Sequence, residues 1–163
     1  MSIQLIVCTP RHFFQESLCV EDVNRALSRF AECIAGIPGS PVLNVVQNSE
    51  YLSVDLFTRA EELMEALLKR EFPEHTDALN PTVYLPSEHA LHGPLAYSLS
   101  VRGTELSWRI GDVPSLSRAI ACVASVADMQ PELEREFLRD SVRLYKTALR
   151  TAVKENCPIF VSY

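Results

Sequence analysis

The spacing of apolar side chains predicts the elements of the first half of the chain. Alternating apolar positions indicate a strand over residues 3–8. Apolar side chains three to four residues apart then predict an amphipathic helix over residues 20–35. Two arms of a hairpin are expected over residues 42–47 and 50–57, and the second arm has one apolar and one polar face.

A second helix and a short strand complete this half. Thr58-Arg59-Ala60-Glu61 has the spelling of a capping box, in which the threonine side chain accepts from a backbone amide and the glutamate reaches back to the threonine amide. A helix is expected from there to Phe72, followed by a strand over residues 82–85. The order strand–helix–strand–strand–helix–strand favours a ferredoxin-like (βαββαβ) first half.

The second half opens with a clear hairpin signal. Apolar and polar residues alternate on both sides of Arg102-Gly103, and this places Trp108 on the buried face. The remaining elements expected are two helices and a final strand, over residues 115–127, 131–155 and 158–163.

Composition agrees with one globular domain. The chain has 163 residues, of which 47% are hydrophobic and 22% charged. No apolar run approaches the roughly 20 residues that a membrane helix needs. We therefore expect a soluble α+β protein with a single domain over residues 1–163, built on an antiparallel or mixed sheet with helices packed on one face.

The cysteines indicate a reducing compartment. There are five of them, an odd number, and none lies within ten residues of another, so the chain has no CxxC motif. Residues 1–8 have neither the basic head nor the small-residue cleavage site of a signal peptide. These features predict a cytoplasmic location.

The formal net charge of −6 changes which partners are expected. Nucleic-acid binding draws its affinity from the neutralisation of phosphates, so an acidic chain disfavours it. Long-range attraction instead favours a protein partner with a basic patch. With five glycines and no Gly-rich phosphate motif, the sequence predicts no cofactor.

The segment over residues 73–94 is a candidate for an irregular functional loop. It contains three of the four histidines, and His89 and His92 would share a face if they lay on one helical turn. That spacing would let two imidazoles reach one zinc ion, with His75, Asp77 or Glu88 as a third ligand and water as the fourth. The spelling Glu88-His89-Ala90-Leu91-His92 differs from the zinc-protease motif HExxH, so the mechanism of that class does not transfer.

The last predicted helix carries a row of basic residues, at positions 135, 139, 143, 146, 150 and 154. Steps of three and four place them on one face. Acids at i−3 precede the first three of them, and ion pairs Glu132–Arg135, Glu136–Arg139 and Asp140–Arg143 are expected there. Arg143, Lys146, Arg150 and Lys154 form either a solvated face that complements the helix dipole or a surface for an anionic group.

Nucleophilic catalysis has one candidate. Cys8 precedes His12 by four residues, and a thiolate beside an imidazolium is an activated nucleophile. A cysteine at the end of a buried strand is more commonly a small core residue. The chain lacks the G-x-S-x-G elbow and both common nucleotide-binding motifs.

Three functions follow from these features. The sequence favours a non-catalytic cytosolic protein-binding protein whose acidic surface meets a protein partner, in the manner of an immunity or antitoxin-like inhibitor or an effector chaperone or adaptor. The alternative is a small, metal-assisted enzyme with its site in residues 73–94. A third is a ligand-binding regulatory domain that pairs into a homodimer.

Overall fold

The computed structural model describes residues 2–37, 43–44, 46–87, 95–101 and 104–163. They form one six-stranded mixed sheet in the order β2-β1-β6-β3-β5-β4. The strands are β1 (Ser2–Cys8), β2 (Glu50–Phe57), β3 (Val83–Leu85), β4 (Leu95–Val101), β5 (Thr104–Asp112) and β6 (Ile159–Ser162). Neighbouring strands are antiparallel, except that β3 and β5 are parallel. The predicted α+β class with one sheet is confirmed.

Five α-helices and two 3-10 helices pack on this sheet. The α-helices are α1 (Pro10–Ser17), α2 (Val20–Ala35), α3 (Thr58–Glu71), α4 (Val113–Val126) and α5 (Glu132–Glu155). The 3-10 helices are η1 (Pro73–Leu79) and η2 (Ala127–Met129). The expected helices over 20–35, 58–72, 115–127 and 131–155 are present within two residues at each end.

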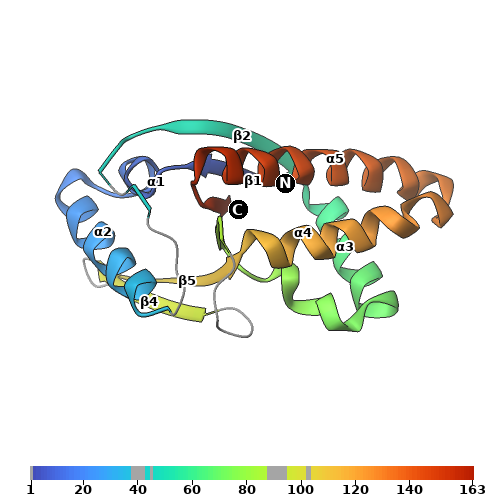
Figure 1. Ribbon diagram of the computed structural model, residues 1–163, viewed down its shortest axis with the longest axis horizontal. Helices are drawn as coiled ribbons and strands as arrows, with labels where there is room; N and C mark the ends of the chain where they lie inside the picture. Colours follow the sequence, from blue (N-terminus) through green and yellow to red (C-terminus); the bar gives the residue numbers. More distant parts are fainter. Residues whose placement is uncertain (1, 38–42, 45, 88–94, 102–103) are drawn as a thin grey trace.

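The helices cover both faces of the sheet, and not the one face that the sequence predicts (Figure 1). Ile3, Leu5 and Val7 of β1 point to the face covered by α3, α4 and α5. On the other face, α1 and α2 pack against side chains that include Ile110 and Phe160. Side chains alternate along a strand, so strands that are apolar at consecutive positions supply both clusters.

The ferredoxin-like arrangement is not confirmed: β1 pairs with β2 and β6, and no described residue of the expected first hairpin arm lies in a strand. Among residues 42–47, the structure describes 43, 44, 46 and 47, and none of these is in a strand. The Asn44 side-chain oxygen accepts from the backbone amides of Val46 (3.2 Å) and Gln47 (3.0 Å). Such a local bond gives the backbone an alternative to a strand ladder. Strand β2 therefore pairs antiparallel with β1, across α1 and α2 in sequence.

Two further elements are the final strand, which is present as predicted, and a helix that the sequence pattern does not predict. Strand β6 lies inside the sheet between β1 and β3, and its Ile159 and Phe160 are both 0% exposed. The other is α1, which periodicity does not reveal but which begins after an N-cap, Thr9, whose side chain accepts from the amide of His12. At α3 the N-cap position is Phe57, which makes no side-chain cap hydrogen bond, so Thr58 is the first helical residue and not the N-cap that the predicted capping box requires.

Candidate functional site

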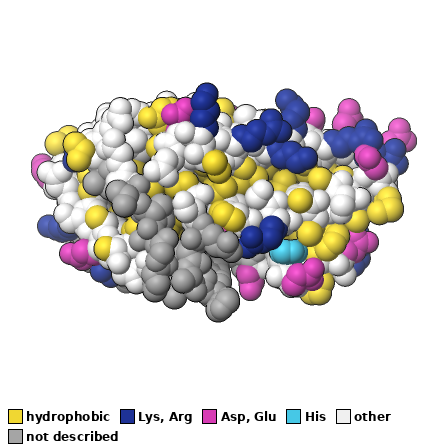
Figure 2. All heavy atoms as spheres, in the orientation of Figure 1, with side chains coloured by type: hydrophobic (Ala, Val, Ile, Leu, Met, Phe, Trp, Pro, Cys, Tyr) yellow, Lys and Arg dark blue, Asp and Glu magenta, His cyan; other side chains and the backbone are white. Residues whose placement is uncertain are grey.

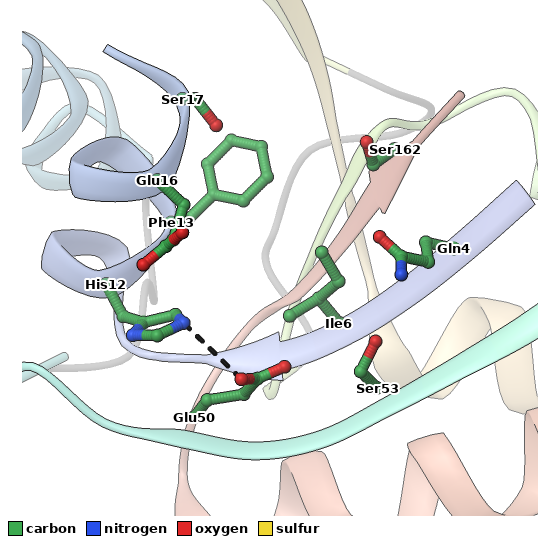
Figure 3. Close-up of a pocket in the computed structure, with 9 residues that line it drawn as sticks. All are labelled: Gln4, Ile6, His12, Phe13, Glu16, Ser17, Glu50, Ser53 and Ser162. Atoms are coloured by element: carbon green, nitrogen blue, oxygen red, sulfur yellow. Dashed lines mark ion pairs between the residues drawn. The ribbon is translucent and has the colours of Figure 1, made fainter. Parts of the chain in front are cut away.

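A cleft of about 390 Å³ opens on the face of the sheet that carries α1 (Figure 3). Its floor consists of side chains from β1, β2 and β6, and one wall comes from α1. The lining residues are Gln4, Ile6, His12, Phe13, Glu16, Ser17, Glu50, Ser53 and Ser162. The lining is therefore mostly polar, with two carboxylates and one imidazole.

Strand register explains why polar side chains gather on this floor. Gln4 pairs with Ser162, and Ile6 pairs with Ser53, so each pair lies side by side on one face. The intervening residues of β1 and β2 point to the opposite face and enter the large apolar cluster. Ser53 and its neighbour on the same face, Asp55, are exposed. The alternation in residues 50–57 predicts this polar face, and that prediction is confirmed.

His12 is held at the mouth of the cleft between two elements. Its Nδ1 lies 2.7 Å from Oδ1 of Asn48, and its Nε2 lies 3.6 Å from a carboxylate oxygen of Glu50. With the Asn48 oxygen as acceptor, Nδ1 carries the proton and Nε2 faces Glu50. Two hydrogen bonds hold Thr9, the residue before α1, against the segment that precedes β2. The amide of Thr9 donates to the backbone oxygen of Ser49 (2.9 Å), and the hydroxyl of Thr9 accepts from the amide of Ser49 (3.1 Å).

The charge of the cleft is negative when His12 is neutral. Glu16 and Glu50 supply two carboxylates, and no lysine or arginine is among the lining residues. The side chains of His12 and Glu50 are 21% and 42% exposed, respectively. The two side chains form an ion pair only when His12 is protonated, and in such partial contact with water that pair contributes at most about 1 kcal/mol to stability. The arrangement is thus suited to attracting a cation from outside more than to holding the fold together.

The hypothesis of an activated Cys8 is wrong. Burial, together with smaller effects of Cys157 and Glu50, raises the pKa of this thiol to about 12, against a smaller lowering by the backbone amide of Phe13. Attack requires the thiolate, which is scarce at neutral pH for such a group. His12 is directed at Asn48 and Glu50 instead. Cys8 is a core residue of the α1–α2 face.

The zinc-site hypothesis concerns His75, His89 and His92. His75 lies in η1 and is half-buried, while the other two lie outside the described residues. Within the described part of the chain, no three His, Cys, Asp or Glu side chains gather in a way that could hold a metal ion. The metal site therefore stays a prediction.

The basic row on α5 is exposed on the opposite side of the sheet from the cleft. Its dark blue side chains follow the edge of the molecule over α5 (Figure 2). The expected Asp140–Arg143 pair is present at 3.8 Å, whereas Arg139 pairs with Asp128 of η2 at 2.6 Å. No described carboxylate lies within 4.0 Å of the remaining cations of the row, Arg135, Lys146, Arg150 and Lys154, so the expected Glu132–Arg135 pair is not present; Arg135 instead donates to the backbone oxygen of Gln130.

Sequence reasoning missed the central pair of the site. His12 and Asn48 are 36 residues apart, and only the fold brings them together. One local signal was available, since Thr9-Pro10 has the form of an N-cap followed by a first helical proline. That signal would have placed His12, Phe13 and Glu16 on a helix directly after the first strand.

No described helix is both long and apolar enough to cross a membrane. Comparison of the chain with protein-family models, with curated protein sequences and with solved structures finds no match.

Proposed function

We propose that the protein is a non-catalytic cytosolic binding protein, and that its acidic cleft receives a basic side chain of a protein partner. The observation that carries the proposal is the presence of Glu16 and Glu50 in one open cleft, whose described lining residues include no lysine or arginine. The overall charge of −6 has the same sign as the cleft.

The lining of the cleft favours a charged side chain over an apolar ligand. Sites for small organic ligands are mostly apolar, with a few polar groups. Here Ile6 and Phe13 are the apolar exceptions in a lining of serines, acids and amides. A lysine or arginine inserted from a partner would keep its stem against these two side chains and its charge beside the carboxylates.

Several features suit a cytosolic inhibitor or adaptor. All five cysteines are free, as expected in a reducing compartment. An acidic surface accelerates encounter with a basic patch on a partner, and the acceleration weakens as salt rises. An immunity or antitoxin-like inhibitor, or an effector chaperone, acts in this way when it covers a basic functional surface of its target.

The test begins with covalent capture at the cleft. A photo-reactive phenylalanine analogue replaces Tyr51, which is exposed on β2 beside the cleft, and the matched control carries it at exposed Met129 of η2. The protein that is captured at position 51 but not at 129 is purified, and its affinity is measured by calorimetry.

Charge reversal then decides whether the cleft is the site. Glu16→Lys and Glu50→Lys should each weaken binding at least tenfold, about 1.4 kcal/mol or more. Glu71→Lys, at the exposed end of α3, should change it less than twofold. Affinity should also fall between 50 and 500 mM salt. Equal effects of the three reversals, or binding that salt does not alter, would contradict the proposal.

A further inference from the structure

We propose that the partner supplies its basic side chain from an extended segment that adds to β2 as a further strand of the sheet. This inference rests on the proposed function, because it assigns a conformation and a charge to the partner of the same cleft. Three observations support it: β2 lies at the edge of the sheet, the small side chain of Ser53 lies between that edge and the cleft, and both charged residues of β2 are acidic.

The first step concerns the backbone of β2. It is the terminal strand in the sheet order and, among the described residues, pairs only with β1. Its register with β1 is unbroken from Leu52 to Phe57. The backbone groups that point away from β1 thus form a regular row of donors and acceptors, which is the template for strand addition.

Two common protections of an edge strand, proline and lysine, are missing from β2. The segment Glu50–Phe57 contains no proline and no lysine, and the register shift in this ladder lies at its beginning, opposite Val7 and Cys8. Its two charged residues, Glu50 and Asp55, are both acidic. They would repel an acidic strand and attract a basic one, so they restrict which strand can pair.

The second step connects the edge to the cleft. Neighbouring strands lie about 4.8 Å apart, so an added strand would run close beside Ser53. Ser53 is small and exposed, and it belongs to the cleft lining together with Glu50. A lysine opposite Ser53 can therefore cross over it and place its ammonium group beside the Glu50 carboxylate and the ring of His12 (Figure 3).

Apolar contacts exist at both ends of the strand. Tyr51 is 39% exposed, and Phe57 is 67% exposed with its ring 6.2 Å from that of Phe137 on α5. Rings so placed offer apolar surface to the terminal residues of an added strand. Their separation along β2 matches a segment of about seven residues at 3.3 Å per residue.

Charge decides between a foreign strand and a second copy of this chain. Antiparallel pairing of two β2 strands would bring Glu50 and Asp55 of both copies onto one small surface, with no basic residue of β2 to balance them. Like charges across a strand pair are destabilising. The occupant is therefore a segment of another protein with lysine or arginine at alternate positions.

The experiment uses the full chain and three capped octapeptides. One alternates lysine with valine, the second alternates glutamate with valine, and the third is the lysine peptide with alternate backbone nitrogens methylated. Binding is followed by amide hydrogen exchange of residues 50–57. In the lysine peptide complex, every second amide of β2 should exchange at least tenfold more slowly than in the free protein.

Comparing the peptides and the charge-reversal variants separates the contribution of backbone pairing from that of charge. The methylated peptide should bind at least tenfold more weakly than the lysine peptide, and the glutamate peptide should not bind. Asp55→Lys should weaken the lysine peptide at least tenfold, whereas Glu71→Lys should leave it within twofold. These variants change exposed side chains, so hydrogen exchange of β1 serves as the check that the sheet is intact.

Two outcomes overturn the inference. In the first, the lysine peptide binds, but methylation does not weaken it and the β2 amides are not protected from exchange. That result would be consistent with binding in the acidic cleft but would exclude strand addition to β2. The other is no binding of the lysine peptide at about 1 mM, a concentration that detects about 4 kcal/mol of affinity. A different result contradicts the proposed function: the affinity of the captured partner is the same for the protein with Glu16→Lys or Glu50→Lys as for the unchanged protein.

Discussion

Replacing Glu61 by glutamine removes a carboxylate whose surroundings disfavour its charge. Glu61 lies in the first turn of α3 and is half-buried. Burial, together with the smaller effects of the neighbouring charges of Glu65 and Glu62, raises the pKa of its carboxyl from 4.5 to about 7. The favourable end of the helix dipole acts in the opposite direction but does not offset these effects.

The sign of the effect on stability follows from the two pKa values. Below pH 4.5 the carboxyl holds its proton in both the folded and the unfolded protein, so it does not influence folding. Between pH 4.5 and about 7 the unfolded chain has lost the proton and the folded protein retains it, so stability falls as pH rises. Above pH 7 both forms are ionised, and the full penalty remains.

The magnitude comes from the same pKa difference. At about 1.4 kcal/mol per pH unit, a rise from 4.5 to about 7 corresponds to about 3 kcal/mol. Because the side chain is partly in contact with water, screening reduces this by about half. Glu61→Gln should therefore raise the free energy of unfolding by about 1–2 kcal/mol at pH 8, with an effect near zero at pH 4.5.

Urea unfolding of the unchanged protein and of Glu61→Gln at pH 4.5 and pH 8 measures this difference in the free energy of unfolding. Trp108 is the only tryptophan, so its fluorescence reports the transition. Glu71→Gln on the same helix is the control, since Glu71 is exposed, and its effect on the free energy of unfolding should be small at both pH values. Equal stabilisation by Glu61→Gln at both pH values, or a loss of stability at pH 8, would refute the reasoning.

Two predictions concern packing. Phe160→Ala should lower the free energy of unfolding by about 3–5 kcal/mol, because Phe160 is 0% exposed among aromatic rings; urea denaturation measures the loss, and Trp108 emission should shift to the red. Gly111→Ala should cost about 1–3 kcal/mol, since an added Cβ would lie 2.6 Å from Cγ of Pro81. Gly36→Ala is the matched control: its nearest contact would be 3.5 Å, and a melting temperature as low as that of Gly111→Ala would contradict the packing argument.

Elements with a strong local period could be predicted from the sequence. Helices α2 to α5 each carry an apolar stripe, and the hairpin β4–β5 alternates over both arms, so the period alone defines them. Residues 42–47 show the limit of this reasoning. Their apolar run is typical of a strand, but Val46 is 75% exposed and the Asn44 side chain occupies the backbone amides that a ladder would use.

The position of β6 in the sheet could not be predicted from its composition. A run such as Ile159-Phe160-Val161 suits either an edge or an interior strand, and its neighbours are set by contacts with β1 and β3. The interior position has a structural consequence for the site. It places Ser162 beside Gln4 on the floor of the cleft, so the end of the chain contributes to a site that begins in the first strand.

The two charged surfaces also differ in the chemistry they permit. The α5 row projects from one helix into water, where each cation is screened within about 8 Å at physiological salt. The cleft holds its two carboxylates against apolar Ile6 and Phe13 on the other face of the sheet, where a bound cation would lose part of its water and gain a stronger attraction. The proposed basic partner would be repelled by the basic row on α5 and attracted by the cleft. The charge distribution therefore supports approach from the α1 face with α5 turned away, and this is the orientation in which an extended segment could reach the edge of β2.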